Sequence, residues 1–332
     1  MLDCNERAHD GRAQERRVCL TDLHPSADDF RAAVIEGLAR SEKSLPYRFL
    51  YDAQGSALFD RITRLPEYYP TRTELGILRD NAAEIADRLG RGVQLVELGS
   101  GSSEKVRVLL DALEAPDSYV PIDISRDHLR AAAQAIQDDY PDLHVRPIAA
   151  DFGQPFDLAP SERGRRVGFY PGSTVGNLTP DQARAFLADW SRRLGEGALL
   201  LIGVDLRKGA DILEPAYDDA QGVTARFTLN LLERANRELG ADFDVAAYRH
   251  SARWLPDDGR VAIDLVSLKD QTVRIGDHAF VLAQDERIHV EDSFKYSIAG
   301  FLALARASGF GPVSVWTDDL DLFSVHLLRA RA

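Results

Sequence analysis

The sequence predicts an α/β fold in which a mostly parallel sheet carries helices on both faces. Apolar, β-like runs alternate with helical stretches between about residues 91 and 208, and the alternation resumes after residue 295. A glycine-rich turn joins the first of these runs to a helix. Such alternation is typical of βαβ units, whose buried strands lie between helices. A chain of 332 residues is long enough for this domain and a sizeable insertion.

We expect four segments along the chain. Residues 1–22 are charged and aperiodic, which predicts a mobile tail, and residues 23–90 predict a helical region. The first helix of that region places Phe30, Val34 and Leu38 on one face. The sheet domain takes residues 91–208 and 296–332. Between its two parts, a helical stretch followed by an alternating pattern predicts an inserted α+β domain over residues 209–295.

Composition excludes several classes of partner. The chain has 40 basic and 53 acidic residues and a net charge of −13, without a basic stripe, so we expect no nucleic-acid binding. No apolar run approaches the roughly 20 residues of a membrane-spanning helix, and the N-terminal stretch lacks the apolar segment of a signal peptide. Cys4 and Cys19 have no metal-like spacing. We therefore expect a cytoplasmic protein that acts without a metal or a membrane.

The stretch "VELGSGSSEKV" (96–106) contains the glycine-rich turn. Glycines at positions 99 and 101 follow a strand and precede a helix, which is where backbone N–H groups can approach a ligand. Two such glycines can equally make a tight turn and nothing more. The third glycine of a dinucleotide fingerprint is missing, since Lys105 and Val106 occupy that region, and NAD is disfavoured.

Carboxylates follow the next two predicted strands. Asp123 lies in "PIDIS" (121–125), at the end of the second strand and about twenty residues after the turn, where it can accept both hydroxyls of a ribose. Asp151 and Phe152 end the third strand, where they can receive an adenine amine and cover its ring. Asp151 alone would more often be a helix cap. Together the three strand ends favour S-adenosylmethionine (SAM).

Several longer motifs resemble one enzyme family. The stretches "FLYDAQGSALFDRITRLPEYYPTRTE" (49–74), "ELGSGSSEK" (97–105), "GSTVGNLTP" (172–180), "AYDDAQGVTARF" (216–227) and "NRELGADFD" (236–244) are similar to those of the SAM-dependent histidine α-N-methyltransferases of ergothioneine biosynthesis. The similarity runs from about residue 45 to the C-terminus. It implies a Rossmann-like class I methyltransferase domain with a substrate-binding insertion, to which the N-terminal helices contribute part of the site.

The resemblance also implies roles for individual residues. Tyr51 would lie beside the sulfonium and the substrate amine, and Asn177 would help to hold the substrate α-carboxylate. Glu291 and Ser293 would hold the imidazole, and Ile263 takes the place of a methionine near that ring. The cofactor contacts would be Tyr51, Gly99, Lys105, Asp123, Asp151 and Phe152; the substrate contacts would be Phe59, Tyr68, Gly172, Thr174, Asn177, Tyr217, Ile263, Glu291 and Ser293; Tyr51 and Asn177 would be catalytic.

The implied activity is methyl transfer from SAM to the α-amino group of L-histidine, up to the trimethylated betaine hercynine, as the first step of ergothioneine biosynthesis. Such a transfer needs alignment and a water-poor site rather than a covalent nucleophile. Neutral donors on the carboxylate would add no positive charge beside the amine. Two alternatives stay open: α-N-methylation of another aromatic amino acid such as tryptophan, against which Glu291 argues because an indole has one N–H and no second polar nitrogen, and a non-catalytic sensor of SAM or histidine.

Overall fold

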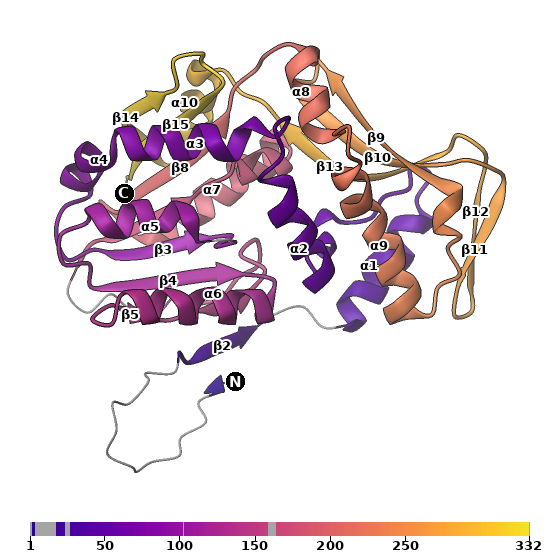
Figure 1. The fold of residues 1–332 in the computed structure, drawn as a ribbon, viewed down its shortest axis with the longest axis horizontal. Coiled ribbons are helices and arrows are strands. Elements are labelled where there is room, and N and C mark those ends of the chain that lie inside the picture. The colour runs from indigo at the N-terminus through magenta and orange to yellow at the C-terminus, as the bar shows by residue number, and fades with distance from the viewer. Residues whose placement is uncertain (1, 4–17, 24–26, 102, 159–163, 332) are drawn as a thin grey trace.

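The computed structural model describes residues 2–3, 18–23, 27–101, 103–158 and 164–331 (Figure 1). Its main sheet confirms the predicted α/β fold. From one edge to the other, this sheet contains β1 (Leu2–Asp3), β2 (Leu20–Leu23), β6 (Ile148–Ala150), β4 (Ser118–Asp123), β3 (Gln94–Leu98), β7 (Arg166–Tyr170), β8 (Leu199–Asp205), β15 (Phe323–Ala330) and β14 (Phe310–Thr317), with β5 (His144–Val145) paired to β4.

The strands from β2 to β8 are parallel, so their carboxyl ends meet at one edge of the sheet. β15 is antiparallel to both β8 and β14. The order reverses at β3, whose neighbours are β4 and β7. In open α/β sheets, ligands bind beyond the carboxyl ends of the strands at such a reversal. The turn after β3 therefore lies where a cofactor would be expected.

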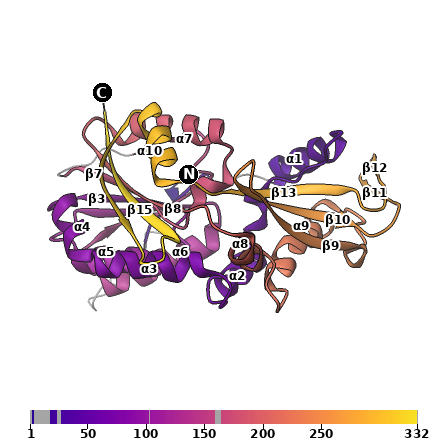
Figure 2. The same cartoon turned by 90° about the horizontal axis from the view of Figure 1, so that it is seen from above.

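Two layers of helices cover the main sheet, as Figure 2 shows. The apolar faces of these helices pack onto the strands in two buried clusters, one on each side of the sheet. In the part of the chain that the structure describes, no helix is both long and apolar enough to span a membrane. One face carries α3 (Tyr69–Asp80), α4 (Ala82–Leu89), α5 (Glu104–Ala112) and α6 (Arg126–Asp139); the other carries α7 (Pro180–Leu194) and α10 (Ile298–Ala307).

The segment between β8 and α10 forms a second lobe beside the sheet (Figure 1). The chain leaves and re-enters at neighbouring points, because Leu206 and Tyr296 form a β-bridge. Within this lobe, β13, β10 and β9 form one antiparallel sheet, and β11 and β12 form a hairpin. Its elements are α8 (Ala210–Tyr217), α9 (Val223–Leu239), η3 (Val245–Ala247), β9 (Tyr248–Leu255), β10 (Arg260–Ser267), β11 (Gln271–Ile275), β12 (His278–Leu282) and β13 (Arg287–Phe294).

The predicted N-terminal helical region divides between the two lobes. α1 (Ala27–Ala39), η1 (Tyr47–Leu50) and α2 (Ala53–Ile62) place Phe30, Val34 and Phe49 in one core with Phe227 and Leu231 of α9. α3 and α4 instead pack on the main sheet. The first and last helices of this region therefore bury their apolar faces against different partners.

The predicted mobile tail is wrong at its C-terminal end. Leu20–Leu23 form β2, which pairs in parallel with β6 at the edge of the main sheet, and β1 pairs with β2. Leu20 is buried against Leu129 and Ala149. The edge strand β6 has backbone groups that a further strand can satisfy, and this pairing outweighs the polar composition. The remaining positions of the predicted tail, 1 and 4–17, lie outside the described residues.

Candidate functional site

A cavity lies between the carboxyl edge of the main sheet, the N-terminal helices and the inserted lobe. Every residue predicted above to contact cofactor or substrate lines it, although these residues come from distant parts of the chain. They are Tyr51, Phe59, Tyr68, Gly99, Lys105, Asp123, Asp151, Phe152, Gly172, Thr174, Asn177, Tyr217, Ile263, Glu291 and Ser293.

The turn after β3 needs its glycines. Gly99 and Gly101 have φ angles of +75° and +40°, a region that favours glycine, and a Cβ on Gly99 would meet the Phe152 ring at 3.8 Å. Asp123 ends β4 beside this turn and accepts hydrogen bonds from Ser125 N at 2.8 Å and Gly101 N at 3.4 Å. Burial raises the pKa of Asp123, and these N–H groups oppose that rise. The Asp123 side chain lines the cavity, where its oxygens can accept hydrogen bonds from hydroxyl donors.

The end of β6 provides a flat apolar surface beside a second carboxylate. Asp151 Oδ1 accepts a hydrogen bond from Gly153 N at 2.9 Å. The Phe152 ring packs edge-on against Tyr170 and Phe186, with centroids 5.8 and 6.1 Å apart. These contacts fix the ring in the cavity wall, where it can cover a planar group.

Lys105 is held in the cavity by a buried carboxylate. Its Nζ lies 2.6 Å from Glu74 Oε2, and Glu74 has no exposed side-chain surface. The same oxygen accepts a hydrogen bond from Gly172 N at 2.8 Å. Glu74 thereby links α5, which carries Lys105, to the loop after β7. The paired ammonium is placed to hold an anionic group of a ligand.

Aromatic rings enclose the middle of the cavity. The Tyr51 ring lies 5.6 Å from Phe59 and 5.5 Å from Phe227, and Tyr68 lies 6.3 Å from Phe59 and 6.1 Å from Tyr217. Burial raises the pKa of Tyr51, Tyr68 and Tyr217, so their hydroxyls stay protonated. Such a wall excludes water and attracts cationic groups through its ring faces.

Two polar side chains of β13 enter the cavity from the inserted lobe. Ile263 pairs with Glu291, but the next residue, Asp264, pairs with His289, so Val290 forms a β-bulge. Glu291 and Ser293 line the cavity. Burial, with a smaller contribution from Asp292, raises the pKa of Glu291 to about 7. No described residue donates a hydrogen bond to the Glu291 carboxylate, so it is available to a ligand N–H.

Asn177 reaches the cavity from the end of η2 (Thr174–Asn177). The preceding Gly176 allows η2 to lie close to β13, because a Cβ there would meet Phe294 O at 2.7 Å. The close approach brings Asn177 beside the β13 residues. The side-chain amide makes no hydrogen bond with any part of the chain that the structure describes, so both its donor and its acceptor can serve a ligand.

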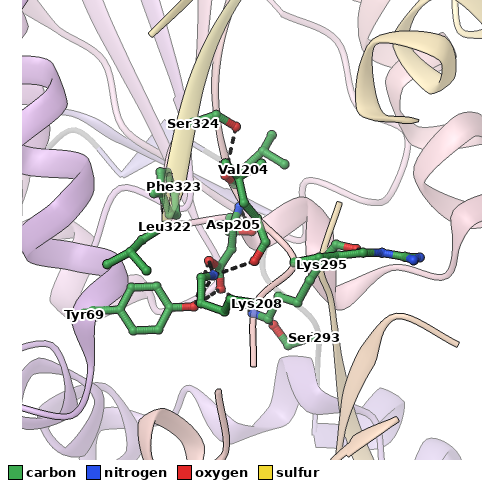
Figure 3. Close-up of polar contacts among 12 residues, drawn as sticks. Tyr69, Val204, Asp205, Lys208, Ser293, Lys295, Leu322, Phe323 and Ser324 are labelled. Carbon is green, nitrogen blue, oxygen red and sulfur yellow. Dashed lines mark hydrogen bonds and ion pairs between the residues drawn. The ribbon is translucent and has the colours of Figure 1, made fainter. Parts of the chain in front are cut away.

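The floor of the cavity holds a cluster that the sequence did not predict (Figure 3). Lys295 Nζ contacts Tyr217 Oη at 2.6 Å, Ser293 Oγ at 2.7 Å and Asp205 Oδ2 at 2.6 Å. An ammonium therefore stands directly behind two residues that line the cavity, Tyr217 and Ser293. Glu291 and Ser293 of β13 and Lys295, directly after this strand, lie two residues apart, and this period of two was the available signal.

Helix α9 supplies further lining residues that the sequence did not single out. Thr224, Phe227 and Thr228 face the cavity from successive turns of this helix. Their spacing of three and four residues places them on one face. The sequence predicts this shared face, but helical spacing alone does not distinguish a face buried in a core from one that lines a ligand site.

Comparisons with known proteins agree with this geometry. A family model described as "Histidine-specific methyltransferase, SAM-dependent" matches residues 30–330. A histidine N-alpha-methyltransferase of Mycolicibacterium smegmatis is 42% identical over 307 residues, which cover 91% of this chain and 95% of the relative. The enzyme of the same name from Mycobacterium tuberculosis is 43% identical over 90% of this chain and 94% of its own. Ergothioneine biosynthesis protein 1 of Neurospora crassa is 33% identical over 86% of this chain, but the match covers 33% of that larger protein.

Proposed function

Because this chain belongs to the family of SAM-dependent, histidine-specific methyltransferases, we propose that it methylates the α-amino group of L-histidine three times. The product is hercynine, and this reaction is the first step of ergothioneine biosynthesis, the process that appears in the name of the Neurospora crassa relative. The observation that carries the choice of substrate is the Glu291 carboxylate, which lines the cavity without a donor among the described residues. An imidazole ring supplies the missing N–H.

The residues at the strand ends suit SAM. Asp123 would accept the ribose hydroxyls, Asp151 would accept the adenine amine, and Phe152 would cover the adenine ring. Lys105, held by Glu74, and the backbone at Gly99 would bind the methionyl end. When bound, SAM supplies a methyl group on a positively charged sulfur.

The substrate would lie between the aromatic wall and β13. Asn177, Tyr68 and Tyr217 would hold the α-carboxylate, with Gly172 and Thr174 of the loop after β7 beside them. Glu291 and Ser293 would take the two ring nitrogens, and Phe59 and Ile263 would pack against the ring. Because the substrate would be held both at its ring and at its carboxylate, the α-amine between these two groups would have little freedom to move.

The protein contributes mainly alignment. Tyr51 would accept an N–H of the amine and keep the nitrogen lone pair in line with the methyl carbon. SAM would supply the methyl group and leave as neutral S-adenosylhomocysteine; the amine would release one proton after each of the first two transfers, and the third transfer would give a quaternary ammonium with no proton to lose. The aromatic rings exclude water from the reacting atoms and tolerate the cationic product.

A direct test is mass spectrometry of the purified enzyme incubated with SAM and each proteinogenic amino acid in turn. We expect mono-, di- and trimethylated histidine, with other amino acids far less modified. The Asp123→Ala variant, tested at the same SAM concentration, shows whether turnover depends on the proposed cofactor site. Preferential methylation of tryptophan, or of no amino acid, would contradict the proposal.

A further inference from the structure

A fully buried cation lies directly beneath the proposed substrate position. The Lys295 and Asp205 side chains both have no exposed surface, and they form an ion pair with Nζ and Oδ2 2.6 Å apart. Figure 3 shows Lys295 and Ser293 on one side of Asp205, and Lys208 and Tyr69 on the other. Burial would raise the pKa of Asp205, but the two ammonium groups outweigh burial and hold that pKa below its usual value.

The hydrogen bonds of Lys295 leave it no free donor. An ammonium has three N–H groups and no acceptor, and Lys295 directs one each to Asp205, Tyr217 and Ser293. The two hydroxyl oxygens therefore accept from Lys295 and cannot donate to it. Tyr217 Oη and Ser293 Oγ lie 2.8 Å apart, so at most one hydroxyl hydrogen can lie between them. The other hydrogen must point elsewhere, and both residues line the cavity.

We propose that Lys295 is a positioning residue that makes the hydrogen-bonded pair of hydroxyls at Tyr217 and Ser293 donate a hydrogen towards the substrate. The inference rests on the function proposed above. With Lys295 in place, both oxygens accept from the ammonium, one hydroxyl hydrogen lies between Tyr217 and Ser293, and the other points into the cavity, where it can donate to the substrate. Without Lys295, that hydroxyl is free to donate to Asp205 instead. The ammonium also places a positive charge one hydroxyl away from the carboxylate, yet it does not touch the amine.

Lys208 provides a matched control within the same cluster. Its Nζ lies 2.6 Å from Asp205 Oδ1, and its side chain is almost fully buried. It also donates to Tyr69 Oη at 2.7 Å. Within the described part of the chain it has no hydrogen bond to Tyr217 or Ser293. Removing Lys208 therefore costs Asp205 one of its two ammonium partners, as removing Lys295 does, but leaves the substrate hydroxyls in place.

The first test compares Lys295→Met with Lys208→Met. We expect both to lower the melting temperature, because each leaves a buried carboxylate with fewer partners. Only Lys295→Met should raise KM for histidine, by roughly 10-fold or more, since it releases two hydroxyls that contact substrate. The affinity for S-adenosylhomocysteine, measured by calorimetry, should be unchanged in both. An equal rise of KM in the two variants, or no rise in Lys295→Met, would overturn the proposal.

A double-mutant cycle distinguishes a positioning role of Lys295 from a purely structural one, because it measures whether the effect of Lys295→Met on KM depends on Tyr217. If Lys295 acts through Tyr217, its replacement should raise KM much less in a Tyr217→Phe background, so the two effects should not add. Additive effects would contradict this coupling. Where Lys295→Met does not fold, Lys295→Met combined with Asp205→Asn removes both members of the Lys295–Asp205 ion pair while Tyr69 Oη and the Leu206 carbonyl still accept from Lys208. This double variant should still show the raised KM; an unchanged KM would overturn the proposal.

These outcomes separate the two levels of inference. Wild-type enzyme that methylates histidine, together with unchanged KM in the Lys295 variants, would refute the role of Lys295 alone. Wild-type enzyme that does not methylate histidine would refute the proposed function, and the role of Lys295 would fall with it.

Discussion

Replacement of Glu291 tests how the cavity recognises the substrate ring. Burial, followed by the charge of Asp292, raises the pKa of Glu291 from its usual 4.5 to about 7. At 1.36 kcal/mol per pKa unit, ionisation of this carboxyl in the empty cavity is about 3 kcal/mol less favourable than in water. A ring N–H would offset much of that cost, because a hydrogen bond to a charged group contributes about 1.5–3 kcal/mol. We therefore expect Glu291→Ala to lower kcat/KM for histidine roughly 10- to 150-fold.

The same substitution should change the preference between rings. Truncation of Glu291 removes the demand for a ring N–H and leaves apolar space that a larger indole can occupy. The ratio of kcat/KM for tryptophan to kcat/KM for histidine should therefore rise in Glu291→Ala. Both amino acids are assayed with wild type and variant at one SAM concentration. A ratio that does not move would show that Glu291 does not recognise the ring.

The pH dependence gives an independent check on Glu291. Its carboxylate accepts an N–H only when ionised, so wild-type kcat/KM for histidine should rise as the pH passes upward through about 7. The free substrate titrates in the same range, but it does so equally for Glu291→Gln. The ratio of wild-type to Glu291→Gln kcat/KM isolates the enzyme group and should rise from pH 6 to pH 8. A ratio that is flat or falls with pH would refute the reasoning.

Three further predictions follow from the same geometry. Because folding raises the pKa of Glu291, its ionised form destabilises the folded state. Glu291→Gln should therefore have a higher free energy of unfolding than wild type at pH 8, and this difference should shrink towards pH 5. Urea titrations at both pH values would contradict the reasoning if the difference grew towards pH 5. Asp123→Ala should weaken binding of S-adenosylhomocysteine by about 1.5–3 kcal/mol in calorimetry, and an unchanged Kd would remove Asp123 from the site. Asn177→Ala should raise KM for histidine with little change in cofactor affinity, and histamine, which lacks the carboxylate, should be a poor substrate; histamine turnover equal to that of histidine would exclude a carboxylate clamp.

The cofactor half of the cavity was predictable because it follows from one rule of architecture. Gly99 and Asp151 directly follow a strand and Asp123 is the last residue of one, and parallel strands of one sheet end at the same edge. Local sequence therefore determines their neighbourhood. The site residues of the N-terminal helices and of the insertion do not lie at the ends of these strands. Only the longer motifs, through their resemblance to a family, placed them at the same site.

The rest depended on contacts between distant segments. Lys295 continues the spacing of two of Glu291 and Ser293 just beyond the end of β13, but its partner Asp205 ends β8, ninety positions earlier in the chain. The bulge at Val290 also resets the alternation, so His289 meets Asp264 on the opposite face of the sheet from Glu291. Neither the pairing nor the bulge leaves a mark in local composition. For the same reason, polar residues that become the edge strand β2 could not be told from a tail.

The core shared by the N-terminal helices and the inserted lobe has a consequence for inheritance and for engineering. Phe30 and Val34 of α1 are buried with Leu231 and Leu232 of α9, although some two hundred positions separate them. An exchange of the insertion alone between relatives would set these helix faces against a foreign surface. The two stretches must therefore diverge together, or be grafted together. The inserted lobe can be exchanged at Leu206 and Tyr296, where the chain leaves and re-enters the main domain at neighbouring points. The N-terminal helices can be exchanged at the short link from α2 to α3.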